Sequence, residues 1–575
     1  MLHSMTRRPA GKHYRPEPAP RHRARGARAI APAQPSSTEC SSKVEDRAAR
    51  SSNMVSVLVV ISRLTGFLRT SAQAWALGAT MLASCYTIAD QLPNVLYELV
   101  VGGMLITSFL PVYVKVKNEL GAKPATEYAS NLLSVVAFLM VALTVLALVF
   151  AAPVIWTQSA GASETFDYDL AIWLFRCFAI EILLYALSSI FSGVLNAERD
   201  YLWSNVAPVL NNVVIIGAFI LYGVTTRTGV LPQEQALLFL AIGNPLGVAM
   251  QVLIQVPALR RHGIRLRLRV NLRDPALKQT LSIGLPTLIV TLVAYPTYAA
   301  MSSSALSVTD AGAAVSYYAR VWYVLPFSVF AIPISTTLFT EMSNYVTRGE
   351  LPAFVSVFTS GMRKIIFTLI PFMLYFAVFS PYLIQIIAGG SFSGDLVSLT
   401  AGYLTTLALT LPWYGLSSYL QKACSALMKM KLYAAATCVA AVVQIAMCFA
   451  LTPIFGLNLV AFSSMVYYLI IDVGVMVQLR FHLGRIGFSS VVASALRAMV
   501  LGGAGAAAGW LVLQGCTALF GPCRGVLMNL VYVAAGGVVS LVVTFGAATL
   551  LGVSDAPFFD SIFRRLLPCR VRSRR

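Results

Sequence analysis

The sequence predicts an all-α protein that crosses a membrane many times, and three observations support this prediction. Hydrophobic residues make up 57% of the 575 residues and charged residues only 11%, whereas roughly 25% of the residues in an average soluble domain are charged. The apolar residues gather in stretches of about 20 or more, the length that a helix needs to cross a bilayer. The net charge of +20 comes from short basic clusters between these stretches, which is typical of a polytopic membrane protein and not of a nucleic-acid-binding one.

About fourteen apolar stretches follow one another, and each is long enough to form a membrane-spanning helix. They lie near residues 54–80, 84–113, 126–155, 168–195, 203–224, 234–258, 277–305, 311–343, 355–388, 397–424, 432–453, 456–479, 488–514 and 526–552. Lysine and arginine in short loops set the orientation of a membrane protein, and here they gather in every second loop, as in the run from Arg260 to Lys278. The alternate loops carry acids such as Asp167 and Asp310. This alternation predicts that both termini lie on the cytoplasmic side.

One sequence pattern occurs twice, six spans apart. The second span reads LPNVLYELVVGGMLITSFLPVYVKVKNELG from Leu92, the eighth reads LPFSVFAIPISTTLFTEMSNYVTRGELP from Leu325, and each is followed by a polar turn and an apolar helix. Because six is even, both copies have the same orientation, which predicts two six-helix lobes related by a pseudo-two-fold axis along the membrane normal. The last two spans stand outside the repeat as two extra C-terminal helices.

These features divide the chain into five parts. Residues 1–52 are rich in Arg, Pro, Ala and Ser without an apolar period, so we expect a basic, disordered cytoplasmic tail. The two lobes cover residues 53–272 and 273–485, and the extra helices cover residues 486–553. Residues 554–575 mix aromatic residues and leucines with arginines, which fits either an amphipathic anchor on the inner leaflet or a disordered tail.

Charged side chains inside the apolar spans mark the candidate site, because such residues normally face a protein interior or a water-filled cavity. Arg63 and Arg69 lie in the first span, about 120° apart around the helix and about 9 Å apart along it, so they can line one cavity at two depths. Arg320 belongs to the other lobe. Three guanidinium groups that converge between the lobes would suit a diphosphate, because the planar guanidinium binds phosphate oxygens in pairs. The alternative is that each arginine pairs with an acid such as Asp90 or Glu98 and only orders the helices.

Further charged residues in the spans are candidates for the cavity or for ion coupling. They are Asp90, Glu98, Arg176, Glu181, Lys422 and Asp472. Arg176 and Glu181 are five residues apart on one predicted helix, which favours a local ion pair or a contact between lobes over substrate binding. Lys422 lies near the end of its span and can extend its amine to the membrane surface. Asp472 either couples an ion or satisfies a neighbouring polar group, and the sequence does not decide between them.

The glycine pair Gly102 and Gly103 lies midway along the second span. Breaks in a membrane helix are tolerated where neighbours or a cavity satisfy the backbone, and they let the helix bend. The pair is therefore the best candidate hinge, with an ordinary packing kink as the alternative.

Patterns of an enzyme or of a metal site are not found. The nine cysteines and five histidines lack metal-type spacing, and no phosphate-binding glycine loop or Ser/His/Asp set is present. Asp167 and Asp169 have the shape of a glycosyltransferase acid pair, but a solvated turn explains them better. Cys516 and Cys523 share one predicted extracytoplasmic loop, where a disulfide and two free thiols are equally expected. We therefore expect a protein that is not an enzyme and that needs no metal or cofactor.

Three segments together resemble the MurJ (MviN) family of lipid II flippases, of the multidrug/oligosaccharidyl-lipid/polysaccharide exporter superfamily. They are SRLTGFLRTSAQAWALGA from Ser62, the segment from Leu92 given above and SYYARVWYVLPFSVFAIPISTTLFTEMS from Ser316. The resemblance covers residues 53–552. It implies a protein of the bacterial cytoplasmic membrane that flips lipid II, the undecaprenyl-diphosphate-linked disaccharide-pentapeptide, from the inner to the outer leaflet for peptidoglycan synthesis.

The resemblance also implies how the transport occurs. Arg63, Arg69 and an arginine of the eighth span would line a cationic cavity that receives the diphosphate and the sugars. The two extra helices would form a groove for the polyprenyl tail. Alternating access would be linked to the membrane potential or to an ion that the sequence does not identify.

Four positions depart from the family pattern. Thr70 follows the second arginine of the first span, where better-known members have an acid, and Tyr97 and Glu98 stand where those members have an arginine pair. Val321 stands where the arginine of the eighth span would align, and Arg320 precedes it by one position. We therefore expect the arginine pair of the first span to bear more of the anion binding here than in relatives.

The interpretation that follows is a monomeric lipid II flippase. Its expected partners are lipid II and membrane lipids, with proteins of cell-wall synthesis as further candidates and no nucleic acid. Two alternatives stay open. A polysaccharide-unit or multidrug exporter of the same fold is one, since a fold does not fix a substrate, although intramembrane arginines argue against export of cationic drugs. A membrane-embedded cell-wall glycosyltransferase is the other, and it would need an acidic residue at the outer membrane face.

Overall fold

The computed structural model describes most of the chain from residue 58 onward. The described residues are 58–102, 109–388, 392, 394–484, 486–522, 525–553 and 555, without the side chains of 282–291. The tail over residues 1–52, residues 554–575 apart from Asp555, the second hinge residue Gly103, and Cys523 of the candidate disulfide lie outside this description. The predictions that concern them therefore stay predictions.

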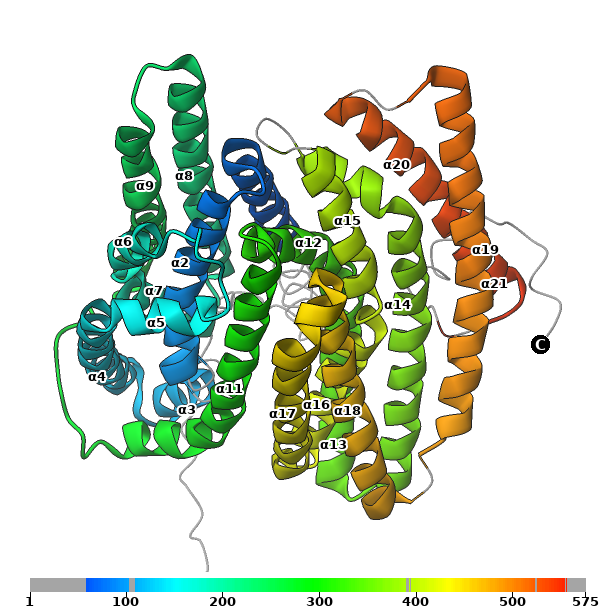
Figure 1. Ribbon diagram of the computed structural model, residues 1–575. Helices are drawn as coiled ribbons and strands as arrows, with labels where there is room; N and C mark the ends of the chain where they lie inside the picture. Colours follow the sequence, from blue (N-terminus) through cyan, green and yellow to red (C-terminus); the bar gives the residue numbers. More distant parts are fainter. Residues whose placement is uncertain are drawn as a thin grey trace, which may run out of the picture. The chain divides into compact units, whose positions relative to one another are not determined.

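All regular secondary structure in this part of the chain is helical (Figure 1). The first group of helices comprises the helix over residues 58–77, α2 (Met81–Tyr97), η1 (Glu98–Gly102), α3 (Leu110–Leu120), α4 (Ala122–Val149), α5 (Ala151–Ser159), α6 (Tyr168–Phe178), α7 (Glu181–Ala197), α8 (Tyr201–Thr228), α9 (Gln233–Leu253) and α10 (Gln255–Arg261). The second group comprises α11 (Pro275–Val308), α12 (Gly312–Pro326), η3 (Phe327–Ala331), α13 (Ile332–Arg348), α14 (Leu351–Ile387), α15 (Gly394–Ala408), α16 (Leu411–Ala426), α17 (Met430–Phe455) and α18 (Leu457–Leu483). The chain then continues through α19 (Phe488–Phe520), α20 (Val526–Leu541), η4 (Val542–Gly546) and α21 (Ala547–Leu550).

The helices have the length and composition of membrane spans. Among the described residues, 10 helices are long and apolar enough to cross a membrane, or 11 if the pair α15 and α16, bent by 45°, forms one span. Three more predicted spans, near residues 54–80, 84–113 and 277–305, contain residues that the structure does not describe or whose side chains it does not describe. The predicted all-α, many-spanning fold is therefore confirmed, and the count of about fourteen spans is consistent with it.

Capping residues explain where several helices begin and end. The hydroxyl of Thr80 accepts the N–H of Ala83 and starts α2, and the carboxylate of Asp274 accepts the N–H of Ala276 and starts α11. Short polar side chains are favoured there because they satisfy backbone N–H groups that have no partner within the helix. Gly349 ends α13 with φ 74°, a left-handed conformation that glycine adopts without strain.

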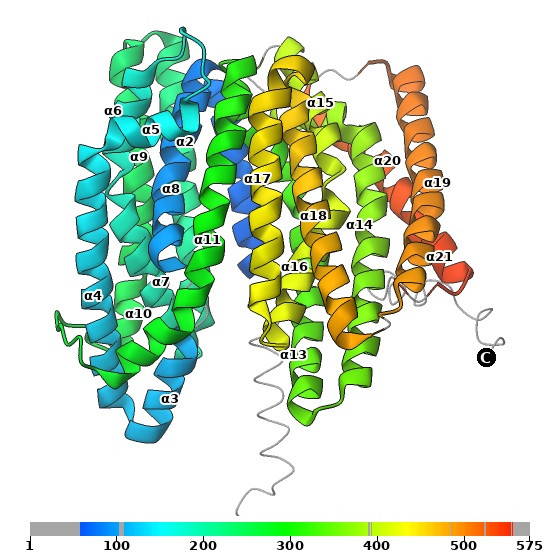
Figure 2. The same cartoon turned by 60° about the horizontal axis from the view of Figure 1, so that its bottom comes forward.

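The two groups of helices form two lobes, and the long helices of both run alongside one another (Figure 2). They meet where α2 packs on α12 and where α11 contacts α3, α4 and α5. At the end that carries the acidic loops, the Tyr318 hydroxyl donates to the carbonyl of Gly78 over 2.8 Å. At the same end, the Thr165 hydroxyl donates to Asp310 over 2.7 Å. Polar contacts therefore join the lobes at this end.

Both copies of the sequence repeat contain a π-helical turn. In the first copy η1 follows α2, which includes Pro93, and in the second copy η3 follows Pro326. A π-helical turn holds one more residue than the same stretch of α-helix and often marks a functional site. Gly102, the described member of the candidate hinge, is the last residue of η1. Whether the chain bends there during transport stays a prediction.

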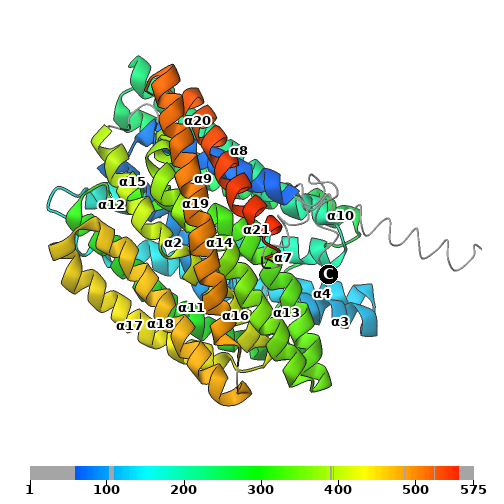
Figure 3. The ribbon, with the colours of Figure 1, turned by 90° about the vertical axis from the view of Figure 1, so that its right-hand side faces the viewer.

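The two C-terminal helices pack on the second lobe. Figure 3 shows α19 running along α14, with α20 and α21 beside it. Glycines also bring α19 close to α20: a Cβ on Gly505 would lie 2.7 Å from the backbone oxygen of Ser540, and one on Gly509 would lie 2.9 Å from that of Gly536. Small residues at such contacts let helix backbones approach within a membrane.

Gly505→Ala should therefore destabilise the protein by about 1–3 kcal/mol, the range seen when atoms are forced into a packed interior. Thermal unfolding of the purified protein in detergent measures this effect. The matched control is Gly503→Ala in the same helix, because a Cβ there meets nothing within 4 Å. Equal losses for both variants would show that helix propensity and not close packing controls this interface.

Candidate functional site

A cavity of about 470 Å³ lies between the lobes. The first lobe contributes one wall through α2 and η1, including Gln91, Asn94 and Glu98. The second lobe contributes the rest through α11, α12 and α15 to α18. A cavity of this size falls within the usual range for small-molecule sites.

Tyrosine is the commonest side chain of this cavity. The described lining contains Tyr295, Tyr298, Tyr317, Tyr323, Tyr403, Tyr414, Tyr467 and Tyr468. Four of them form an aromatic cluster, in which the ring of Tyr414 lies 5.6 Å from that of Tyr323 and 5.1 Å from that of Tyr468, whose ring lies 5.0 Å from that of Tyr467. Such rings present apolar faces together with hydroxyl groups. This arrangement can bind a ligand that has both apolar faces and hydroxyl groups, as a sugar ring does.

Arg320 is the one lysine or arginine among the described residues that line this cavity. Its side chain is exposed, and no carboxylate in the described part of the chain pairs with it. Val321 occupies the position at which the family pattern has its arginine, and it is not among the lining residues. The guanidinium of Arg320 is therefore available for an anionic ligand, one position earlier than the family pattern suggests.

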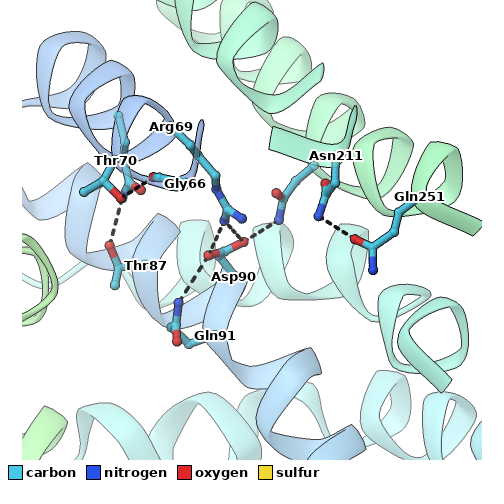
Figure 4. A network of polar contacts seen from close by, with 10 residues as sticks. Gly66, Arg69, Thr70, Thr87, Asp90, Gln91, Asn211 and Gln251 are labelled. Carbon is cyan, nitrogen blue, oxygen red and sulfur yellow. Dashed lines mark hydrogen bonds and ion pairs between the residues drawn. The ribbon is translucent and has the colours of Figure 1, made fainter. Parts of the chain in front are cut away.

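Arg69 is instead tied into the first lobe. One terminal nitrogen of its guanidinium lies 2.8 Å from both carboxylate oxygens of Asp90, and the amide of Asn244 donates to the same carboxylate over 2.8 Å (Figure 4). The exposed fractions are 14% for the Arg69 side chain and 4% for Asp90. The structure thus shows the pairing that the sequence left as an alternative for Arg69.

Arg63 lies about one and two-thirds turns before Arg69 on the helix over residues 58–77 and is exposed. Neither arginine is among the described residues that line the cavity between the lobes. Of the three predicted arginines, Arg320 alone lines this cavity. Their predicted contact with substrate stays a prediction.

Two further acids are buried in the lobes. Glu181 at the start of α7 and Asp472 in α18 are both 0% exposed. Each has a neighbouring hydroxyl, that of Tyr185 or Ser417, and neither forms an ion pair with a described residue. Arg176 is exposed and does not form the expected ion pair with Glu181. The reason is that α6 ends at Phe178 and α7 begins at Glu181, so the two residues do not share one regular helix.

The remaining candidates have separate environments. Glu98 is exposed to the cavity and accepts from the amide of Asn94 over 3.4 Å. The amine of Lys422 donates to the hydroxyl of Thr336 over 2.8 Å. Asp167 caps α6 by accepting the N–H of Leu170 over 2.9 Å, which gives it a structural role.

Two of the four positions that depart from the family pattern also have hydrogen-bond partners in the structure. The hydroxyl of Tyr97 donates to Ser189 over 2.6 Å, and Thr70 is buried and donates to the carbonyl of Gly66 over 3.3 Å. Groups of three or more metal-binding side chains do not occur in the described part of the molecule.

Comparison with known proteins gives one family. The family model described as lipid II flippase MurJ matches residues 73–529. A probable lipid II flippase MurJ of Borreliella burgdorferi is 23% identical over 374 residues, which cover 64% of this chain and 71% of the relative. The lipid II flippase MurJ of Burkholderia cenocepacia is 23% identical over 363 residues, which cover 62% of this chain and 69% of the relative.

Solved structures agree at the level of the fold. A lipid II flippase MurJ in an inward closed conformation matches with a TM-score of 0.67 at 19% identity, covering 89% of this chain and 99% of that one. An inward-facing multidrug resistance MATE transporter of the MOP superfamily matches with a TM-score of 0.61 at 15% identity, covering 75% and 99%. These likenesses support the predicted arrangement of two lobes and additional C-terminal helices.

Proposed function

Because this chain belongs to the lipid II flippase MurJ family, we propose that it moves lipid II from the inner to the outer leaflet of the bacterial cytoplasmic membrane. The observation that supports this proposal best is the cavity between the lobes, which combines the guanidinium of Arg320 with a tyrosine lining. A diphosphate joined to a disaccharide needs both an anion-binding group and surfaces for sugar rings. The proposed activity is transport and not catalysis, since moving the headgroup requires no covalent step.

The geometry suggests a role for each part of the cavity. The guanidinium of Arg320 donates charge-assisted hydrogen bonds to the diphosphate, and Tyr323, Tyr414 and Tyr468 contact the sugars. A cavity of about 470 Å³ is too small to hold an undecaprenyl chain as well, so the chain stays in the membrane beside the protein. Polar contacts join the lobes at the end of the acidic loops, and at the opposite end the hydroxyl of Tyr128 lies 2.5 Å from that of Thr280 at the start of α11.

The orientation follows from the basic loops. We propose that they, and with them both termini, lie in the cytoplasm, as the distribution of lysine and arginine favours. Separation of the lobes at the end of the basic loops would then admit lipid II from the inner leaflet. Separation at the end of the acidic loops would release the headgroup outside.

Coupling to an ion gradient or to the membrane potential belongs to the same proposal. A buried carboxyl group without an ion-pair partner is costly when charged, and ionisable residues inside spans often mark ion pathways. Glu181 in the first lobe and Asp472 in the second are buried and form no ion pair with a described residue. Uptake of a proton or a cation at either residue would remove that cost, and the lobes offer one such residue each.

The test is depletion of the protein in its host, followed by a leaflet-accessibility assay for lipid II. We expect lipid II to accumulate in the inner leaflet and to return to the outer leaflet when the full chain is expressed again. Normal outer-leaflet accessibility without the protein, in a host that lacks other flippases, would contradict the proposal. Loss of cell-wall polymerisation with unchanged lipid II accessibility would point to the glycosyltransferase instead.

A further inference from the structure

A second cavity lies at the end of the first lobe that carries basic loops, apart from the cavity between the lobes. Its volume is about 680 Å³. It is formed by α3, the first turns of α4, Glu198 after α7, and the segment 262–269 that leads to the second lobe. None of these residues lines the cavity assigned to transport.

The segment that forms one wall is held firmly to α4. The N–H of Arg269 donates to the hydroxyl of Ser134 over 2.8 Å. Asn131 binds Asn271 twice, accepting its N–H over 2.7 Å and donating to its carbonyl over 2.9 Å. Ile264 anchors the start of the segment, being 5% exposed. The backbone that carries the arginines is therefore fixed by side chains of a neighbouring helix.

Arginines alternate with leucines along this segment, as Arg265, Arg267 and Arg269 alternate with Leu266 and Leu268. Leu268 lines the cavity together with the arginines. All three arginines line the cavity, as do Lys117 and Lys123. The only acids in the described lining are Glu127 and Glu198, so lysine and arginine leave a surplus of three positive charges.

Both of these acids already form ion pairs within the protein. Glu127 pairs with Arg269 over 2.6 Å, and Glu198 pairs with Lys117 over 2.5 Å. No described carboxylate lies within ion-pair distance of Lys123, Arg265 or Arg267. Three cations therefore face one concave space without a counter-charge from the described part of the protein.

The start of α4 adds to this potential. Ala122 and Lys123 line the cavity, Gly121 provides no side-chain cap, and the first turn contains no acid. The partial positive charge of a helix N-terminus and its free N–H groups favour an anion. This contribution supports the side-chain cations and does not replace them.

We propose that this cavity binds the phosphate group of an anion, either the headgroup of an anionic lipid or a free polyphosphate. Arg265 and Arg267 supply paired hydrogen bonds to the phosphate oxygens, and Lys123 supplies a third charge. Basic loops are expected on one side of any membrane protein for orientation alone. Orientation, however, requires neither a concave site nor a backbone fixed by Ser134 and Asn131.

The test uses the full chain carrying Arg320→Gln, so that the cavity between the lobes contributes no cation. The site variant adds Lys123→Gln, Arg265→Gln and Arg267→Gln. The control variant adds Arg260→Gln, Arg273→Gln and Lys278→Gln, which remove the same charge from the same region without touching a lining residue. One arm measures binding of inorganic pyrophosphate by calorimetry in neutral detergent. The other counts phosphatidylglycerol molecules retained in nanodiscs that also contain phosphatidylcholine.

We expect the site variant to bind at least one of the two probes tenfold or more weakly than the control, with both variants melting at the same temperature. Loss of pyrophosphate binding alone identifies a free phosphate anion as the ligand, and loss of phosphatidylglycerol alone identifies a lipid headgroup. Equal binding by the two variants, or an equal loss in both relative to the parent, would overturn the proposal. The result does not depend on the proposed transport of lipid II, which is measured separately.

Discussion

Asp90→Asn should destabilise the protein by about 3–5 kcal/mol, the usual cost of removing one partner from a buried ion pair. The substitution leaves the guanidinium of Arg69, which is 14% exposed, without a negative charge in the interior of the first lobe. Asn244 would also lose a charged acceptor. Thermal unfolding of the purified chain in detergent is the measurement.

Two variants make the interpretation of this result specific. The double variant Arg69→Met with Asp90→Leu removes both charges together, and it should recover most of the lost stability, because buried ion pairs can often be replaced by apolar residues. The control variant Glu127→Gln breaks the ion pair to Arg269, in which the exposed fractions are 49% for the Arg269 side chain and 44% for that of Glu127. Because exposed ion pairs contribute little, this substitution should lower the free energy of unfolding by less than about 1 kcal/mol. If the Asp90→Asn variant unfolds at the same temperature as the parent protein, the ion pair between Asp90 and Arg69 does not stabilise the protein in solution.

Arg320→Gln should reduce transport of lipid II by about 10- to 100-fold at substrate levels below saturation. Hydrogen bonds to charged groups contribute roughly 1.5–3 kcal/mol each, and each 1.4 kcal/mol corresponds to a factor of about ten. No described residue that lines the cavity offers a second lysine or arginine to replace Arg320. The rate of transport in proteoliposomes that contain lipid II measures the effect.

The stability of the Arg320→Gln variant should stay close to that of the parent, because no described carboxylate depends on Arg320. Arg320→Lys keeps the charge and loses the paired geometry, so it should retain part of the activity. Lys422→Gln removes an equal charge from a residue that bonds Thr336 and does not line the cavity, and should transport at nearly the normal rate. Full activity of Arg320→Gln would exclude this guanidinium as the anion-binding group.

The fold could be predicted from the sequence because composition alone restricts it strongly. Apolar stretches of sufficient length, separated by loops of alternating charge, leave few arrangements other than a bundle of spans. The local breaks could not be predicted in the same way. The interruption after Phe178 that separates Arg176 from Glu181 contains neither proline nor glycine, so the sequence predicts a regular helix there, and with it either a local ion pair or a contact between lobes.

The candidate site was predictable only in part. Burial costs identify Arg69 and Arg320 as unusual residues, but they do not say which of the two has a partner. Asp90 lies 21 residues from Arg69 on another helix, and only the packing of the two helices brings the carboxylate to the guanidinium. The tyrosine lining was missed because its members come from several helices, and a tyrosine in an apolar span resembles any other aromatic residue. The doublets Tyr317-Tyr318 and Tyr467-Tyr468 were the available signal.

The π-helical turn Phe327–Ala331 has a consequence for comparing this chain with proteins of different length. The turn accommodates one extra residue. The two flanking helices therefore keep the same rotation relative to each other as in a regular helix that is one residue shorter. Deletion of a residue such as Val329, which is 55% exposed, would restore regular α-helical bonding and leave Arg320 directed at the cavity. The same deletion within α12 would rotate the following helix by about 100°. Alignments across this span should therefore place a one-residue gap inside the turn.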